Sequence, residues 1–118
     1  MVLGSEMTAI LRSLIVSAIL ACSAGQAASA DISIMPSLGP GSATVVFVKG
    51  EFRKGDGADF ELKAGTLRKA LILLSSPGGS IAEALRIGAV IRTQGLATMV
   101  VDECASACAL IWLSGIRR

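Results

Sequence analysis

Two short segments of the sequence carry residues suited to acyl-group chemistry, and each joins a predicted strand to a predicted helix. The first segment, residues 75–80, reads SSPGGS. Its glycine pair permits backbone conformations forbidden to other residues, so a ligand can approach the main chain closely. The N–H groups there lie at a helix start, where partial positive charge favours an anion or a developing oxyanion. This turn therefore predicts Gly78 and Ser80 as substrate-binding residues; a tight turn without a ligand is the alternative.

The second segment, residues 104–110, reads CASACAL and has Ser106 at its centre. A serine that enters a helix from a strand can expose its hydroxyl, which is the placement that a nucleophile needs. A lone serine at a helix start is otherwise an N-cap that hydrogen-bonds its own backbone. Ser106 is therefore a candidate nucleophile with a purely structural alternative.

Alternating strands and helices must position these two turns. Short apolar and β-branched runs predict strands, and longer mixed runs predict helices. Strands are expected at residues 43–48, 71–74 and 96–101, with a turn at 102–104, and helices at 58–70, 80–94 and 105–113. This alternation favours an α/β fold with a mainly parallel sheet.

The helix after the glycine pair has the clearest sequence signals. Ser80 and Glu83 match the S-x-x-E capping box, in which each side chain accepts from the other residue's backbone N–H. Gly95 suits the left-handed position at the C-terminal end. Five positions recur at helical spacing and predict the buried face: Ile81, Ala84, Leu85, Gly88 and Ile91.

The start of the chain has the order of a secretory signal peptide. Arg12 precedes a short apolar run, and small residues then lead to Ala28-Ser29-Ala30, an A-x-A-like site with cleavage expected before Asp31. The protein is then periplasmic or secreted. A lipobox-like run ending at Cys22 is an alternative, and a lipid there would anchor the chain to a membrane.

The expected organisation has three parts. Residues 1–30 form the signal peptide, and residues 31–42, which are rich in proline and glycine, form a linker. Residues 43–118 form the α/β domain.

Composition narrows the chemistry. Histidine is absent, which removes the commonest general base and metal ligand. The net charge of +2 and an aromatic content of 3% give no footprint for nucleic-acid binding. We therefore expect no metal, no cofactor and no nucleic-acid partner.

Cys104 and Cys108 are a close pair in a chain expected to be exported, so a disulfide between them is chemically feasible. Within a regular helix this spacing holds the Cβ atoms too far apart, but the bond becomes feasible if Cys104 precedes the helix. It would then clamp the loop that carries Ser106. Two small buried thiols are the alternative.

The string at residues 73–118, with SSPGGS, a helix ending near Gly95 and then CASACALIWLSG, resembles the Clp-protease/crotonase-like family. It is most similar to exported bacterial Clp-protease-like proteins. The resemblance implies the first part of a ββα superhelix, with Ser106 as a serine-peptidase nucleophile. It also implies that the backbone N–H groups of Gly79 and Ala107 form the oxyanion hole, and that the substrate is a peptide or another acyl compound.

Part of the family's catalytic site has no counterpart here. The family's His and Asp follow the nucleophile helix, and this sequence has no His. We therefore expect a C-terminally incomplete domain that is inactive alone. A Ser–Lys dyad would need one of four lysines that precede Ser106 and match no base of the family: Lys49, Lys54, Lys63 and Lys69.

Two other interpretations stay open. One is a non-catalytic remnant or pseudoenzyme that binds a peptide or a partner. The other is a small exported or lipid-anchored structural protein. An incomplete sheet would leave apolar surface exposed, which predicts self-association.

Overall fold

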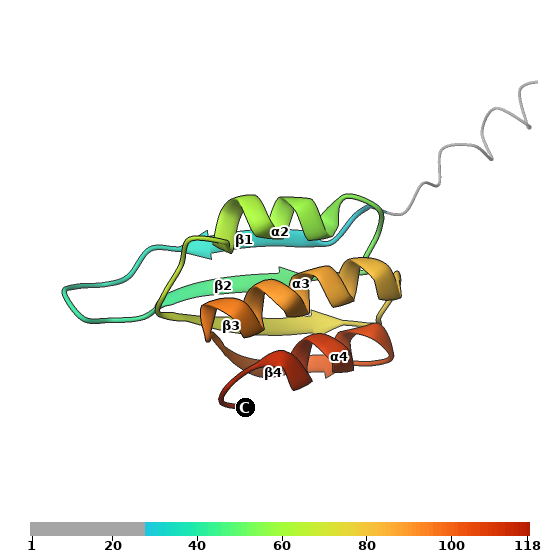
Figure 1. Cartoon of the computed structure of the whole chain (residues 1–118). Helices are drawn as coiled ribbons and strands as arrows, with labels where there is room; N and C mark the ends of the chain where they lie inside the picture. Colours follow the sequence, from blue (N-terminus) through green and yellow to red (C-terminus); the bar gives the residue numbers. More distant parts are fainter. Residues whose placement is uncertain (1–27) are drawn as a thin grey trace, which may run out of the picture.

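The computed structural model describes residues 28–118 of the protein (Figure 1). The predicted signal peptide lies outside these residues except for positions 28–30, and the lipidation site predicted at Cys22 lies outside them as well.

The described chain forms an α/β domain around a four-stranded mixed sheet. The strands are β1 (Asp31–Met35), β2 (Thr44–Lys49), β3 (Ala70–Ser76) and β4 (Ala97–Cys104), and they lie side by side in that order. The β2–β3 and β3–β4 pairs are parallel, whereas β1 runs antiparallel to β2. The predicted α/β class and mainly parallel sheet are therefore confirmed.

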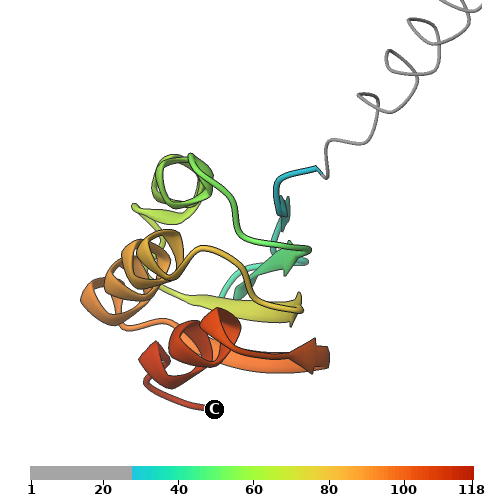
Figure 2. The same cartoon turned by 90° about the vertical axis from the view of Figure 1, so that its right-hand side faces the viewer.

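Three helices cover one face of this sheet (Figure 2). They are α2 (Asp56–Ala64), α3 (Ile81–Gln94) and α4 (Ala107–Ser114). Helix α2 joins β2 to β3, and α3 joins β3 to β4, because parallel neighbours need a crossover connection.

The core lies between the sheet and the helices. Side chains alternate along a strand, so every second residue of β2 and β3 points at the helices. Val46, Val48, Ile72 and Leu74 occupy these positions and are fully buried. The opposite face of the sheet also carries apolar side chains. Met99 and Val101 of β4 lie on that face and are more than half exposed.

The predicted linker at 31–42 is wrong for its first five residues, because Asp31–Met35 form strand β1. The alternation of Ile32 and Ile34 with polar neighbours fits a strand, and Ile32 is buried against the core with 3% of its surface exposed. Prolines and glycines begin only after this strand, where the chain turns back toward β2.

Other details of the elements also differ from the prediction. Helix α2 ends at Ala64 instead of residue 70, since Gly65 follows it as a C-cap. Strand β4 continues through the turn predicted at 102–104, but its register against β3 shifts there. On α3, Ile87 is buried, whereas Ile81 and Leu85 of the predicted face are 59% and 56% exposed. The buried stripe of α3 consists of Ala84, Ile87, Gly88 and Ile91, so those two residues lie outside it.

The predicted capping box forms only in half. The Ser80 hydroxyl accepts a hydrogen bond from the Glu83 backbone N–H at 3.3 Å. The Glu83 carboxylate does not reach back to Ser80; it accepts the Gly57 N–H of α2 at 2.7 Å. The Ser80 N–H donates instead to the Phe52 carbonyl. Glu83 therefore joins the starts of two helices.

We expect Ile32→Ala to destabilise the domain, because Ile32 packs in the core from strand β1. The loss should be about 2 kcal/mol or more in the free energy of unfolding, as for other buried Ile→Ala changes. Ile34 lies on the same strand but is 40% exposed, so Ile34→Ala should cost about 0.5 kcal/mol or less. Urea unfolding of both variants gives the comparison; equal small losses would contradict the packing of β1.

Candidate active site

The two predicted turns meet at the carboxyl ends of β3 and β4. The register shift in β4 brings Cys104 opposite Ser76, the last residue of β3. Just beyond, the Ala105 N–H donates to the Ser76 carbonyl at 3.1 Å. The turns that lead into α3 and α4 therefore start side by side.

Gly78 is the point of contact between the two turns. It is buried and has a φ of 111°, a conformation that favours glycine. A Cβ atom built on Gly78 would lie 2.9 Å from the Ala105 carbonyl oxygen and 3.0 Å from the Cβ of Ser106. Any side chain at this position would therefore push against the turn that carries the candidate nucleophile.

Ser106 has the most unusual backbone conformation in the described part of the chain. Its φ of 53° and ψ of −121° lie outside the regions that L-residues favour, and no other non-glycine residue of 28–118 has a positive φ. Such strain persists only where neighbouring structure enforces it, and it concentrates at functional sites. A strained strand-to-helix turn is also how other folds expose a nucleophilic serine.

The Ser106 side chain is exposed and makes no capping hydrogen bond to α4. Ser106 therefore does not act as a side-chain N-cap, which was the structural alternative. Among residues 28–118, the Ser106 carbonyl alone is engaged, accepting the Ala109 N–H at 2.9 Å. The hydroxyl is left free to reach a ligand.

Gly79 is held from the opposite side by Phe52, in the loop between β2 and α2. The Phe52 N–H donates to the Gly78 carbonyl at 2.9 Å, and the Phe52 carbonyl accepts from Ser80 at 2.8 Å. A Cβ on Gly79 would collide with the main chain of Phe52. The space that a side chain would need is therefore taken by different neighbours, the Ser106 turn beside Gly78 and the Phe52 main chain beside Gly79.

The two N–H groups predicted for an oxyanion hole have no partner within residues 28–118. Neither Gly79 nor Ala107 donates a hydrogen bond there, whereas the flanking Gly78 and Ser80 both donate. Gly79 just precedes the N-cap of α3, and Ala107 is the first residue of α4. Both N–H groups therefore lie at the positive end of a helix dipole, which favours a negatively charged oxygen.

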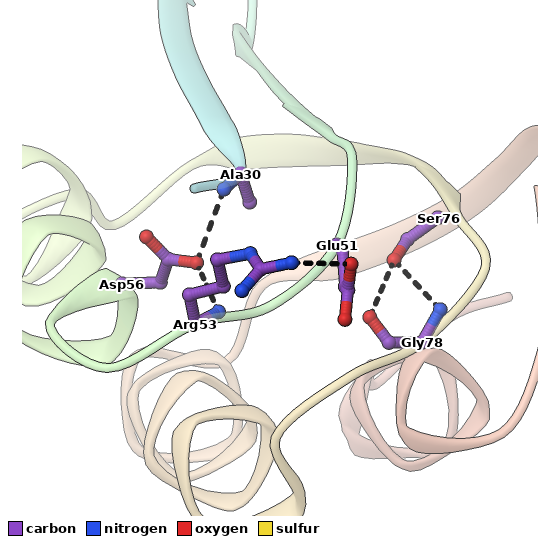
Figure 3. Close-up of polar contacts among 6 residues, drawn as sticks. All are labelled: Ala30, Glu51, Arg53, Asp56, Ser76 and Gly78. Atoms are coloured by element: carbon purple, nitrogen blue, oxygen red, sulfur yellow. Dashed lines mark hydrogen bonds and ion pairs between the residues drawn. The ribbon is translucent and has the colours of Figure 1, made fainter. Parts of the chain in front are cut away.

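Ser76, a residue not predicted to belong to the site, holds the glycine turn in place by hydrogen bonds. Its side chain is fully buried, and its hydroxyl accepts the Gly78 N–H at 3.1 Å and lies 3.3 Å from the Gly78 carbonyl (Figure 3). Its carbonyl also accepts the Ala105 N–H. Ser76 thus contacts both turns. In the sequence, only its place in the SSPGGS run could have indicated this role.

The two cysteines that flank the candidate nucleophile are bonded. The Cys104–Cys108 disulfide joins the end of β4 to the first turn of α4, with a Cα–Cα distance of 5.1 Å. Because Cys104 precedes the helix, the geometric objection to a bond between i and i+4 does not apply. The closed ring contains Ala105, Ser106 and Ala107, so the bond restrains the strained turn directly.

Ser80 has a structural task, since its hydroxyl caps α3. Its predicted contact with substrate stays a prediction. Among the lysines, Lys63 binds Asp59 and the Ile32 carbonyl, and Lys69 donates to the Gly41 carbonyl. These two amines are therefore engaged away from Ser106.

A small depression opens at the same end of the sheet. Its volume is about 190 Å³, and residues near the carboxyl ends of β2, β3 and β4 line it. Its lining is mixed: Phe47, Leu73 and Val101 are apolar, while Lys49 and Asp102 carry charge.

Comparisons with protein-family models, with curated proteins and with solved structures found no match to this chain. Within residues 28–118 no helix has the length and apolar character needed to span a membrane. In the same stretch, no three or more His, Cys, Asp or Glu residues gather as metal ligands.

Gly78→Ala should disturb the site twice, through backbone strain and through collision with Ala105 and Ser106. We expect a loss of about 1–3 kcal/mol in the free energy of unfolding from the strain alone, with the collision adding to it. Gly41 also has a positive φ but has open space around it, and Gly39 has neither constraint. The order of stability should therefore be Gly39→Ala, then Gly41→Ala, then Gly78→Ala. Equal stability of Gly41→Ala and Gly78→Ala would contradict the close contact.

Replacing both Cys104 and Cys108 with serine should lower the free energy of unfolding by about 2 kcal/mol, because the short ring restrains the unfolded chain. Thermal unfolding with and without a reductant checks this value. The reductant should destabilise the wild type and leave the double variant unchanged. Alkylation of both thiols in unreduced protein would contradict the bond.

Proposed function

We propose that this domain is the nucleophile-bearing part of an exported serine hydrolase, related to Clp-protease-like peptidases and acting on a peptide or another acyl compound. In this proposal Ser106 is the nucleophile, and the N–H groups of Gly79 and Ala107 form the oxyanion hole. By themselves the 118 residues acylate slowly at Ser106.

The observation that carries the proposal is the conformation of Ser106. Its exposed hydroxyl sits on a strained turn with a φ of 53°, and Gly78 packs directly beneath that turn. A structural N-cap has no need for such strain, because ordinary caps adopt extended backbone angles. A nucleophile does need to stand clear of its own helix.

The unpaired N–H groups of Gly79 and Ala107 supply the second support. Their helix-terminal positions favour an oxyanion, and the protein places no other acceptor on them within residues 28–118. Preorganised donors of this kind stabilise charge that develops in the transition state.

The proposed reaction follows from these groups. The Ser106 oxygen bonds to the substrate carbonyl carbon while its proton passes to a base, and the carbonyl oxygen becomes an oxyanion held by the two N–H groups. The intermediate then expels the amine or alcohol, which takes up the proton. Water attacks the resulting acyl-serine ester, releases the acid and restores the hydroxyl.

This scheme assigns no general base to Ser106. The sequence has no histidine, and Lys63 and Lys69 hold other partners. An oxyanion hole without its full triad retains roughly 10³–10⁴-fold acceleration over water, so slow acylation of Ser106 is the expected behaviour. The same absence favours a second candidate, a pseudoenzyme that binds a peptide at this turn without cleaving it.

The disulfide supports the exported setting of the proposal. Such bonds persist in oxidising compartments and are rare in the cytosol. The signal-like segment before residue 30 points to the same compartment.

A fluorophosphonate probe tests the nucleophile. Incubated with the exported protein, it should modify Ser106 slowly, and intact mass with peptide mapping should locate one adduct. Ser106→Ala should lose the adduct. Ser114→Ala is the matched control, because Ser114 lies in the same helix and its hydroxyl donates to the Leu110 carbonyl.

Folding must be checked beside labelling, by circular dichroism of each variant. A folded wild type that stays unlabelled over days would exclude the hydrolase and leave the peptide-binding alternative. An adduct that persists in Ser106→Ala would show that the probe reacts elsewhere.

A further inference from the structure

Ala30 belongs to the folded domain, although the sequence assigned it to the segment that is removed. It is only 8% exposed and forms part of the hydrophobic core. Its Cα also lies 3.6 Å from a Cβ built on Gly50, so the two main chains are closely packed. A cut before Asp31 would delete this residue from the core.

The Ala30 backbone nitrogen points at a buried carboxylate (Figure 3). It donates to Oδ2 of Asp56 at 3.1 Å, and the Arg53 N–H donates to the same oxygen at 2.7 Å. Asp56 is 4% exposed at the start of α2, and its other oxygen makes no hydrogen bond among the described residues.

No cationic side chain of residues 28–118 pairs with this carboxylate. The Arg53 guanidinium binds Glu51 at 2.9 Å instead, and Lys63 binds Asp59. A buried carboxylate is costly unless a charge or several hydrogen bonds compensate it. Asp56 thus accepts from two neutral N–H groups, those of Arg53 and Ala30. Ala30 is the first buried residue of the described chain.

Several cuts have small residues at positions −3 and −1, among them those before Ala24 (Ala21 and Ser23) and before Gln26 (Ser23 and Gly25). Three more lie next to the folded domain. They fall before Asp31 (Ala28 and Ala30), before Ala30 (Ala27 and Ser29) and before Ala28 (Gly25 and Ala27). The first cut removes a core residue. The last keeps a neutral amide at Ala30 behind two exposed residues. Only the middle cut puts a positive charge on the nitrogen that faces Asp56.

We propose that the mature protein begins at Ala30 and that its new α-ammonium group forms a buried ion pair with Asp56. The cut hydrolyses the Ser29–Ala30 peptide bond, so Ser29 leaves with the carboxylate and Ala30 keeps the amine. Charge-assisted hydrogen bonds are about twice as strong as neutral ones, so this cut strengthens a contact that already exists. The inference rests on the exported setting of the proposed function and not on its hydrolase activity.

The experiment uses the full 118-residue chain, expressed in a bacterium that secretes it. N-terminal sequencing and intact mass of the exported protein should give Ala30 as the first residue. A start at any other residue, such as Asp31, Ala28 or Gln26, would overturn the inference and leave the nucleophile proposal intact. An uncut leader would overturn both the inference and the exported setting, whereas failed fluorophosphonate labelling of Ser106 would affect neither.

A second measurement tests the ion pair on the same exported protein. The Ala30 α-amine should react with an acylating reagent about tenfold more slowly in the folded protein than in urea, as one charge-assisted hydrogen bond predicts. Asp56→Asn should remove most of this protection. Asp59→Asn, which removes an exposed carboxylate of the same helix, should retain it.

If Asp56→Asn does not fold, the ratio between folded and urea-unfolded wild type still decides the question. An α-amine that reacts equally fast in both states would exclude the buried ion pair.

Discussion

The contact between Gly78 and the turn at Ser106 is the constraint on which the site depends. It exists because β3 and β4 are parallel neighbours whose carboxyl ends finish together, with Cys104 opposite Ser76. The main-chain hydrogen bond from Ala105 to the Ser76 carbonyl fixes the two turns at this distance. With a side chain at Gly78, the turns would have to separate, and the strained conformation of Ser106 would lose its support.

The surrounding fold reinforces this junction from three directions. Phe52 holds the glycine turn from the β2 side through two main-chain hydrogen bonds. Glu83 ties the start of α3 to the start of α2 through the Gly57 N–H. The Cys104–Cys108 bond closes the Ser106 turn onto α4. Each restraint acts on a different segment, so the position of Ser106 depends on the whole domain.

Sequence reasoning found the glycine turn, the Ser106 turn and the parallel order of their strands, because these features rest on local residue types. It missed β1, since counting prolines and glycines over 31–42 hid the short alternation around Ile32. It missed Phe52 for a different reason: only its main-chain atoms take part, and any residue type has those. The partner of Glu83 could not be foreseen because the carboxylate crosses to another helix.

The main-chain role of Phe52 also bears on how a related site would be recognised in another protein. Several hydrogen bonds that shape the candidate site join main-chain peptide groups, which every residue type carries. A geometric pattern therefore describes this site better than a string of letters does. That pattern is two consecutive glycines with positive φ before one helix, and one positive-φ residue before the next. A search for unrecognised relatives would compare backbone torsions at adjacent strand ends and leave side-chain identity aside.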